Sequence, residues 1–275
     1  MKIAIFSDIH ANLYAFSAAL DDAQSQGATD FIFLGDTITD LPWANEVYDI
    51  IRGLDNVKII RGNRERYLLE FTNHINLTEL KQFSSIAWTC SILSDENKAY
   101  ISNMQDRVSF CLHETDFFLD HRPEDIWSAE TSEKLHYYAS STETHEDYTK
   151  IMRSGINGNW DITKNSKGIY LYGHFHGQWH GSYEERLIKY DIEKMLFSFR
   201  HSELYKTSFI FSETIATCIE TGLENYHMLF THLDTVCKSL NMGTSFYPNE
   251  VWETEGLNWL KNYRKKLGLS LDMFL

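Results

Sequence analysis

The chain has 275 residues, of which 43% are hydrophobic and 14% aromatic, enough for one sizeable core and a small additional domain. Its formal net charge of −14, from 25 Lys and Arg against 39 Asp and Glu, argues against nucleic acid and anionic membranes as partners. The apolar stretch 3–6 runs directly into Ser7-Asp8 and is too short for a signal sequence or a membrane span, which predicts a cytoplasmic protein. Four scattered cysteines without a C-x-x-C pair indicate reduced thiols.

The first third of the chain alternates short apolar runs with helical periodicity, which is typical of βα units on a sheet with parallel strands. Asn12 is placed to cap a helix whose apolar residues recur at helical spacing, and Gly27 is placed to end it. The pattern therefore predicts strands over 3–6, 31–34 and 57–60, with helices over 13–26 and 43–51.

The rest of the chain gives a less regular pattern. Residues 65–105 are predicted helical, with a new helix start at Ser94, and residues 124–165 give only weak helical signals. Further strands are expected over 108–110, 117–119 and 169–172. From about residue 193 the pattern is mostly helical, and the basic run 261–266 is typical of a solvated helix face. We therefore expect a catalytic domain over 1–192 and a helical extension over 193–275 packed on it.

Polar residues follow the predicted strands, at the position where α/β sheets gather their reactive groups. Carboxylate, imidazole and amide ligands together suit Mn, Fe, Zn or Ni better than Ca or Mg. A pair of such ions, about 3.5 to 4 Å apart, can clamp a phosphoryl group and activate a water molecule. The candidate metal ligands are Asp8, His10, Asp36, Asn63, His121, His174 and His176. His121, rather than His113, is expected to reach the metals because it follows an apolar run as the other ligands do.

Each of these motifs is common by itself, so the prediction depends on their order along the chain. Asp8-Ile9-His10, Gly35-Asp36, Gly62-Asn63-Arg64-Glu65, His121 and Gly173-His174-Phe175-His176 together resemble the calcineurin-like metallophosphoesterase superfamily over about residues 1–180. The resemblance implies an α/β fold, an αββα sandwich of two mixed sheets flanked by helices. It also implies that Asp8, His10, Asp36 and His176 hold one metal, and that Asp36, Asn63, His121 and His174 hold the other. The opening segment 7–13 and the long tail look most like the bacterial phosphodiesterase branch that includes diadenosine tetraphosphate hydrolases.

Two departures from the superfamily pattern affect the expected chemistry. Arg64 stands where many members have a histidine, and a guanidinium can grip phosphate oxygens but cannot lend a proton. Substrates whose leaving group needs no proton, such as phosphoanhydrides, are then favoured; the alternative is that Arg64 pairs with Glu65 or another nearby acid. The usual Asn-Pro-Gly-Ser turn after the last histidines is missing, so the domain looks shortened by a strand pair.

The sequence thus predicts a dinuclear phosphoesterase that hydrolyses phosphodiester or phosphoanhydride bonds of small nucleotides through a hydroxide held between two ions. Asn63, Arg64 and His174 are the expected catalytic residues, and Arg64, His180 and Arg122 the expected substrate contacts. The expected cofactors are two divalent or trivalent ions of Mn, Fe, Zn or Ni, and the expected partner is a small phosphorylated molecule. Two alternatives stay open: a phosphomonoesterase or protein phosphatase of the same fold, and an inactive regulatory module that holds metal.

Overall fold

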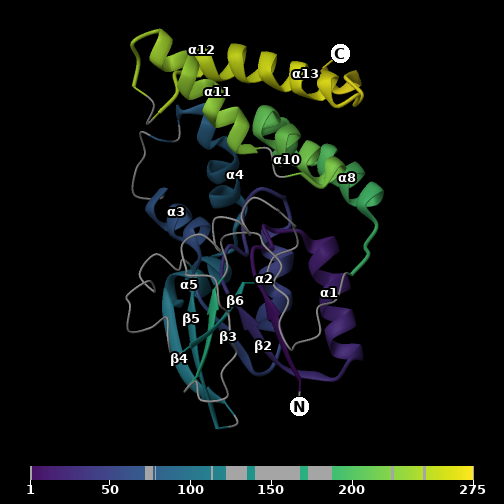
Figure 1. The fold of residues 1–275 in the computed structure, drawn as a ribbon, viewed down its shortest axis with the longest axis vertical. Helices are drawn as coiled ribbons and strands as arrows, with labels where there is room; N and C mark the ends of the chain where they lie inside the picture. Colours follow the sequence, from purple (N-terminus) through teal and green to yellow (C-terminus); the bar gives the residue numbers. More distant parts are fainter. Residues whose placement is uncertain are drawn as a thin grey trace. The chain divides into compact units, whose positions relative to one another are not determined.

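A computed structural model of the chain describes residues 2–71, 77, 79–112, 114–121, 135–139, 168–172, 188–223, 226–243 and 246–274 (Figure 1). The chain divides into two compact units. The first comprises Met1–Thr39, Trp43–Leu69 and Leu93–Tyr190, and the second comprises Asp40–Pro42, Glu70–Ile92 and Asp191–Leu275. The expected domain boundary at residue 192 stays a prediction.

The first unit begins with a parallel sheet that has β2 at its centre. Its strands are β1 (Lys2–Phe6), β2 (Ala28–Phe33) and β3 (Val57–Ile59). The helices α1 (Leu13–Ser25) and α2 (Ala44–Arg52) connect them, which confirms the predicted βα alternation. The predicted cap is confirmed as well, because Asn12 Oδ1 accepts a hydrogen bond from the Ala15 amide at 3.0 Å.

The second sheet of this unit mixes parallel and antiparallel pairs. It runs in the order β4 (Arg107–Leu112), β5 (Thr115–Asp120), β7 (Gly168–Tyr172) and β6 (Leu135–Ala139). Of its three described strand pairs, β4–β5 is antiparallel and the other two are parallel. Strand β6 corrects the weak helical signal read over 124–165, and the reason is tertiary. Its backbone pairs in parallel with β7, a partner about 30 residues further along the chain that local periodicity cannot reveal.

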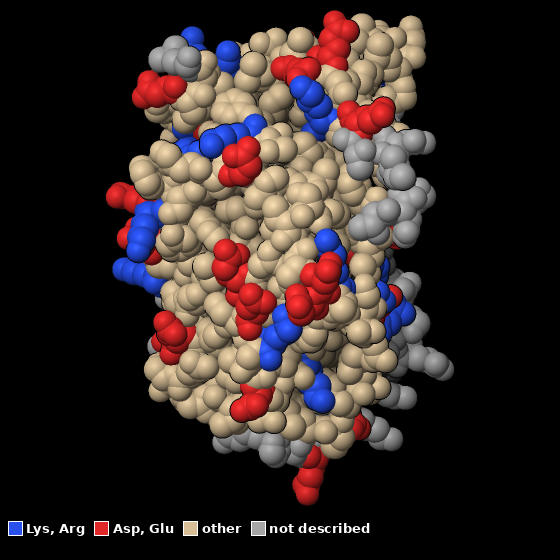
Figure 2. All heavy atoms as spheres, turned by 180° about the vertical axis from the view of Figure 1, so that it is seen from behind, with Lys and Arg blue, Asp and Glu red and all other residues tan. Residues whose placement is uncertain are grey.

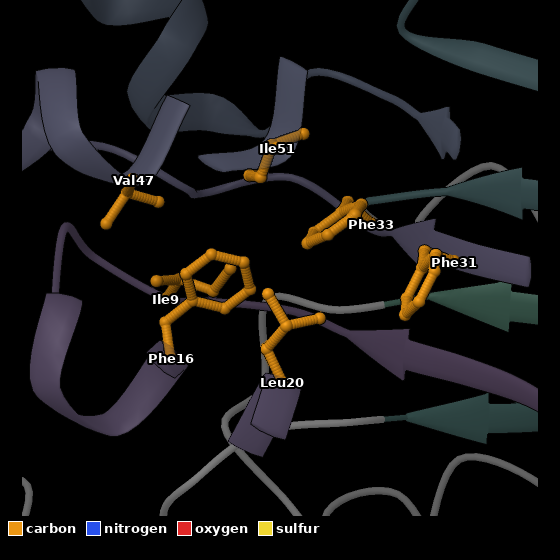
Figure 3. Packing of buried hydrophobic residues seen from close by; sticks show 7 residues of the cluster. All are labelled: Ile9, Phe16, Leu20, Phe31, Phe33, Val47 and Ile51. Carbon is orange, nitrogen blue, oxygen red and sulfur yellow. The ribbon is translucent and has the colours of Figure 1, made fainter. Parts of the chain in front are cut away.

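Among the described residues of the first unit, two apolar clusters hold the layers together. Side chains of α1 and α2 cover one face of the first sheet, where they surround Phe31 and Phe33 of β2 (Figure 3). On the opposite face Ile32, Leu34 and Ile60 meet Phe117 and Leu119 of the second sheet. Alternate residues of β2 therefore serve the two clusters, as the two-residue period of a strand requires. This stacking of helices, first sheet and second sheet agrees with the αββα fold expected from the sequence, with the first sheet parallel and the second mixed in the part of the chain that is described.

The helices expected between 65 and 105 are present, although in several pieces. They are α3 (Asn63–Phe71), a 3₁₀ turn (Lys81–Phe83), α4 (Ser84–Ile92) and α5 (Asp95–Asn103). Ser94 caps α5 as predicted, since its hydroxyl accepts from the Asn97 amide at 3.1 Å. The 3₁₀ turn belongs to the second unit, where the Lys81 amide donates to Asn249 Oδ1 at 2.8 Å and Gln82 Oε1 accepts from the Tyr247 amide at 2.6 Å.

The second unit is helical, as the sequence predicts for the C-terminal extension, and its C-terminal part is drawn in green to yellow in Figure 1. Its further elements are α8 (Ile192–Arg200), α9 (Glu203–Thr207), α10 (Phe209–Thr221), α11 (Tyr226–Ser239), α12 (Asn249–Val251), a π-helical turn (Trp252–Gly256), α13 (Leu257–Lys266) and a terminal 3₁₀ turn (Asp272–Phe274).

A buried ionic network joins the helices of the second unit. Arg264 of α13 is 1% exposed, and its Nη1 lies 2.5 Å from Glu213 Oε1 and 2.7 Å from Glu220 Oε2 of α10. Arg200 of α8 reaches both carboxylates as well, at 2.9 Å each, and Tyr205 donates to Glu213 at 2.6 Å. The expectation that the run 261–266 is a solvated face is therefore wrong for Arg264, which is buried because two acids of α10 satisfy its charge.

The surface seen in Figure 2 carries acidic and basic side chains that are interspersed among uncharged ones. Among the described residues, no helix is long and apolar enough to cross a membrane. The cytoplasmic location stays a prediction.

Candidate metal centre

The loops that follow β1 and β2 run side by side at the carboxyl edge of the first sheet. The Asp8 amide donates to the Gly35 carbonyl at 3.0 Å, and the His10 amide donates to the Asp36 carbonyl at 2.9 Å. Because parallel strands end at the same edge, this backbone ladder brings the Asp-x-His and Gly-Asp motifs together. Their side chains consequently share one small region of the molecule.

Backbone conformation in these loops is unusual at the proposed ligands. Asp8, His10 and Asp36 have φ angles of 52°, 49° and 50°, in the left-handed region that residues with a Cβ seldom adopt. Each such residue carries a conformational cost, and clusters of them persist where the surrounding structure enforces a functional geometry. Three of the candidate ligands thus share a conformation that points to a site.

Two glycines allow the Asp36 loop and the Asn63 loop to touch. A Cβ on Gly35 would lie 2.3 Å from the Gly62 nitrogen, and a Cβ on Gly62 would lie 2.1 Å from Asp36 Oδ1. The glycine in each motif is therefore required by the close approach of the other loop, in addition to the φ of +92° at Gly35. This contact places the residues that follow them, Asp36 and Asn63, next to each other.

The first group of candidate ligands consists of Asp8, His10 and Asp36. One donor atom of each lies within 4.8 Å of the others, and His10 Nε2 is 4.0 Å from Asp8 Oδ1. Asp8 and Asp36 are buried, while the His10 side chain keeps 14% of its surface exposed. Carboxylate oxygens and an imidazole nitrogen at this spacing fit a divalent transition metal.

His121 follows β5 directly and also lies beside Asp36. Its Nε2 is 3.3 Å from Asp36 Oδ2 and 3.1 Å from Asn63 Oδ1, while Nδ1 is 2.7 Å from the Leu34 carbonyl oxygen. The Leu34 carbonyl accepts the Nδ1 proton, which leaves Nε2 facing Asp36 and Asn63. Without a metal a proton on Nε2 satisfies these two acceptors, and a bound metal would take the place of that proton. Metal-binding histidines are commonly oriented in this way, and the arrangement fits a metal held by Asp36, Asn63 and His121.

The charges at the centre are strongly coupled. Burial lowers the pKa of His121, but the negative charge of Asp36 and their hydrogen bond outweigh it and raise the pKa to about 9. For Asp36, burial raises the pKa, and the nearby His121 more than offsets this and lowers it to about 2. A positive charge beside Asp36 is thus favoured, and a metal cation satisfies the same requirement.

Arg64 and Glu65 follow Asn63 on α3 and differ in burial and in hydrogen bonding. Arg64 is half-buried, and its backbone amide donates to Asp36 Oδ1 at 2.7 Å. Glu65 has no exposed surface, and its carboxylate accepts from four backbone amides, those of Asp36, Thr37, Ile38 and Gly62, and from the Tyr48 hydroxyl. Burial and the charge of Asp36 raise the pKa of Glu65, and they outweigh the amides of Gly62 and Thr37, which lower it. The pKa of Glu65 is therefore above its usual value.

The structure therefore brings together five of the seven proposed ligands, namely Asp8, His10, Asp36, Asn63 and His121. His174, His176, His180, Arg122 and His113 lie outside the described residues, as does the segment in which a strand pair was expected to be missing. The sequence reasoning missed the role of Glu65 as an acceptor for the loop amides. An acidic residue two positions after Asn63, at the end of the Gly-Asn-Arg-Glu motif, was the available signal.

Comparison with known proteins agrees with this geometry. A model of the calcineurin-like phosphoesterase family matches residues 1–193. The chain is 30% identical over 104 residues to an uncharacterised protein of Methanocaldococcus jannaschii, a stretch that covers 37% of this chain and 41% of that relative, so less than half of the relative is matched.

Comparison with solved structures gives two matches, of which the first, with a TM-score above 0.5, shares the fold. A metallophosphoesterase from Sphaerobacter thermophilus superposes with a TM-score of 0.52 at 18% identity, covering 81% of this chain and 99% of that one. A hypothetical protein from Pyrococcus horikoshii gives a TM-score of 0.48 at 14% identity, covering 79% and 96%.

The fold and the site are those expected of the metallophosphoesterase family. The family match spans more than half of the chain, which therefore belongs to the calcineurin-like phosphoesterases. Members of this family are hydrolases that generally bind divalent metals, and the chain provides a site that can hold one.

Proposed function

We propose that the protein is a dinuclear metal-dependent phosphoesterase that hydrolyses phosphodiester or phosphoanhydride bonds of small nucleotides. The observation that carries this proposal is the position of Asp36. Its carboxylate is grouped with Asp8 and His10 and also lies 3.3 Å from His121, which in turn is 3.1 Å from Asn63. A single carboxylate that adjoins both sets of donors is suited to bridge two ions, and Mn, Fe, Zn and Ni suit these donors.

In this proposal the residues of the chain have separate roles in binding metal and in binding the phosphoryl group. When bound, two divalent ions would offset charge on the phosphoryl oxygens and lower the pKa of a water molecule that attacks phosphorus. Asn63 has an amide that steers one phosphoryl oxygen, and Arg64 follows it closely enough to hold the others. His174 and His176 complete the proposed ligand set, and His180 and Arg122 are proposed substrate contacts.

Arg64 narrows the substrate class. Its guanidinium keeps its charge throughout the physiological pH range, so it can grip phosphate but cannot protonate a departing oxygen. Leaving groups that are stable as anions, such as a nucleotide phosphate, need no such proton. The carboxylate of Glu65 already accepts from backbone amides and Tyr48, which argues against Glu65 as the partner of Arg64 and leaves another nearby acid as the remaining alternative to a substrate contact.

A parallel assay on metal-depleted and Mn-reloaded protein tests the proposal. The substrates are a dinucleoside polyphosphate, an aryl phosphodiester and an alkyl phosphomonoester. We expect activity only after reloading, in the order anhydride and aryl diester far above alkyl monoester. A preference for the alkyl monoester would replace the proposal with a phosphomonoesterase.

The bridging role of Asp36 is tested separately by Asp36→Asn, which removes the charge and keeps the shape. We expect metal content and activity to fall together. Two metal equivalents per chain in the purified variant, measured by elemental analysis, would refute the bridge.

A further inference from the structure

The carboxylate of Glu65 organises the backbone around the proposed bridging residue. Its Oε2 accepts from the amides of Asp36 at 3.0 Å and Gly62 at 2.8 Å, and its Oε1 accepts from Thr37 at 2.7 Å and Ile38 at 3.3 Å. Three successive amides of the loop after β2 therefore converge on one anion, and a fourth comes from the loop after β3. A ring of amides around an anion in this way is a strong and directional arrangement.

The hydrogen bonds to Glu65 stabilise a loop whose backbone conformation is unfavourable. Asp36 has a φ of 50°. Its side chain lies so close to Gly62 that a Cβ at position 62 would be 2.1 Å from Asp36 Oδ1. A turn in the left-handed region is maintained only if its surroundings stabilise it. Glu65 supplies that stabilisation from α3, and it joins the loop of Asp36 to the loop of Asn63 through the same carboxylate.

Tyr48 in turn fixes Glu65 from a third element. The phenol of Tyr48 on α2 is fully buried and donates to Glu65 Oε1 at 2.9 Å. Its ring packs edge-on against Tyr100 of α5, with centroids 6.0 Å apart. The carboxylate is thereby held between two loops and a helix that is anchored elsewhere in the same unit.

We propose that Glu65, oriented by Tyr48, is a positioning residue that sets the separation of Asp36 and Asn63 and thereby the affinity of the metal centre. This inference rests on the proposed metal centre and assigns it a determinant outside the ligand set. A purely structural role for Glu65 would lower stability and leave metal affinity unchanged.

The chemistry of the carboxylate dictates the variants. Glu65→Gln keeps the size but replaces one acceptor oxygen with an NH₂ group. In either orientation that NH₂ group faces two backbone N–H donors, Thr37 with Ile38 or Asp36 with Gly62, so the loops must move apart. Glu65→Asp keeps the acceptors and shortens their reach by one methylene, while Tyr48→Phe removes one hydrogen bond and retains the ring.

The experiment measures Mn²⁺ affinity of the metal-depleted full-length chain by electron paramagnetic resonance, together with the melting temperature. We expect affinity to fall roughly 10- to 100-fold in Glu65→Gln, as for other residues that orient metal ligands, and by less than about tenfold in Tyr48→Phe. Glu65→Asp is expected between the two, as a partial rescue of Glu65→Gln by an acceptor-only side chain.

Glu213→Gln in the helical unit is the matched control. Glu213 is as fully buried as Glu65 and also accepts several hydrogen bonds, but its partners are Arg200, Tyr205 and Arg264. We expect this control to lose melting temperature and to bind Mn²⁺ like the unaltered chain. Loss of melting temperature without loss of affinity in Glu65→Gln would overturn the inference alone, whereas failure of the unaltered chain to bind Mn²⁺ would overturn the proposed function with it.

Discussion

Replacing Gly62 with alanine tests whether the contact between the two glycine loops sets the geometry of the site. The added Cβ would lie 2.1 Å from Asp36 Oδ1 and 2.4 Å from the Asp36 nitrogen, whereas ordinary contacts begin near 3.4 Å. The Asp36 side chain must therefore move by about 3.4 − 2.1 = 1.3 Å, or the two loops must separate by a similar amount. Metal–ligand distances tolerate only about 0.2 Å, and a displacement of about 1 Å can cost roughly 10²-fold in rate.

We therefore expect Gly62→Ala to bind less metal and to lose at least about 10²-fold in activity on an aryl phosphodiester. Gly53→Ala is the control, because its Cβ would meet the Ile50 carbonyl at an ordinary 3.4 Å and its φ of −82° suits alanine. That variant should be neutral or stabilised by up to about 1 kcal/mol. Full metal content and activity in Gly62→Ala would show that the reasoning from the glycine contact is wrong.

Three further predictions concern other parts of the molecule. Arg264→Met removes one partner of a buried ion pair and should lower the free energy of unfolding by about 3 kcal/mol in urea titrations, while Mn²⁺ affinity stays unchanged. A loss below about 1 kcal/mol would contradict the conclusion that this ionic network stabilises the helical unit. Arg64→His should restore a proton donor and speed alkyl esters by roughly 10²-fold relative to aryl esters, and an unchanged ratio of the two rates would break the link between Arg64 and leaving groups. In the native protein, a thiol reagent followed by peptide mapping should modify the exposed Cys111 well before the buried Cys218 and Cys237, and equal rates would argue against the buried positions.

Much of the described part of the first unit could be predicted from the sequence because its signals are local. Apolar runs and helical spacing predicted the strands and helices through β3. The capping residues Asn12 and Ser94 predicted where α1 and α5 begin. The proposed ligands in the described part of the chain, Asp8, His10, Asp36, Asn63 and His121, could be located as well, because each stands where an apolar run ends.

Tertiary contacts decided the features that have no local signature. Strand β6 exists because β7 pairs with it, and Arg264 is buried because Glu213 and Glu220 meet it from another helix. Glu65 appears in the sequence as one acid beside an arginine, yet its function depends on four amides that come from two loops separated by more than twenty residues. The sequence determined which groups are available for hydrogen bonding and metal binding. The fold decided which of them meet, because at this distance along the chain only long-range packing brings a donor to its acceptor.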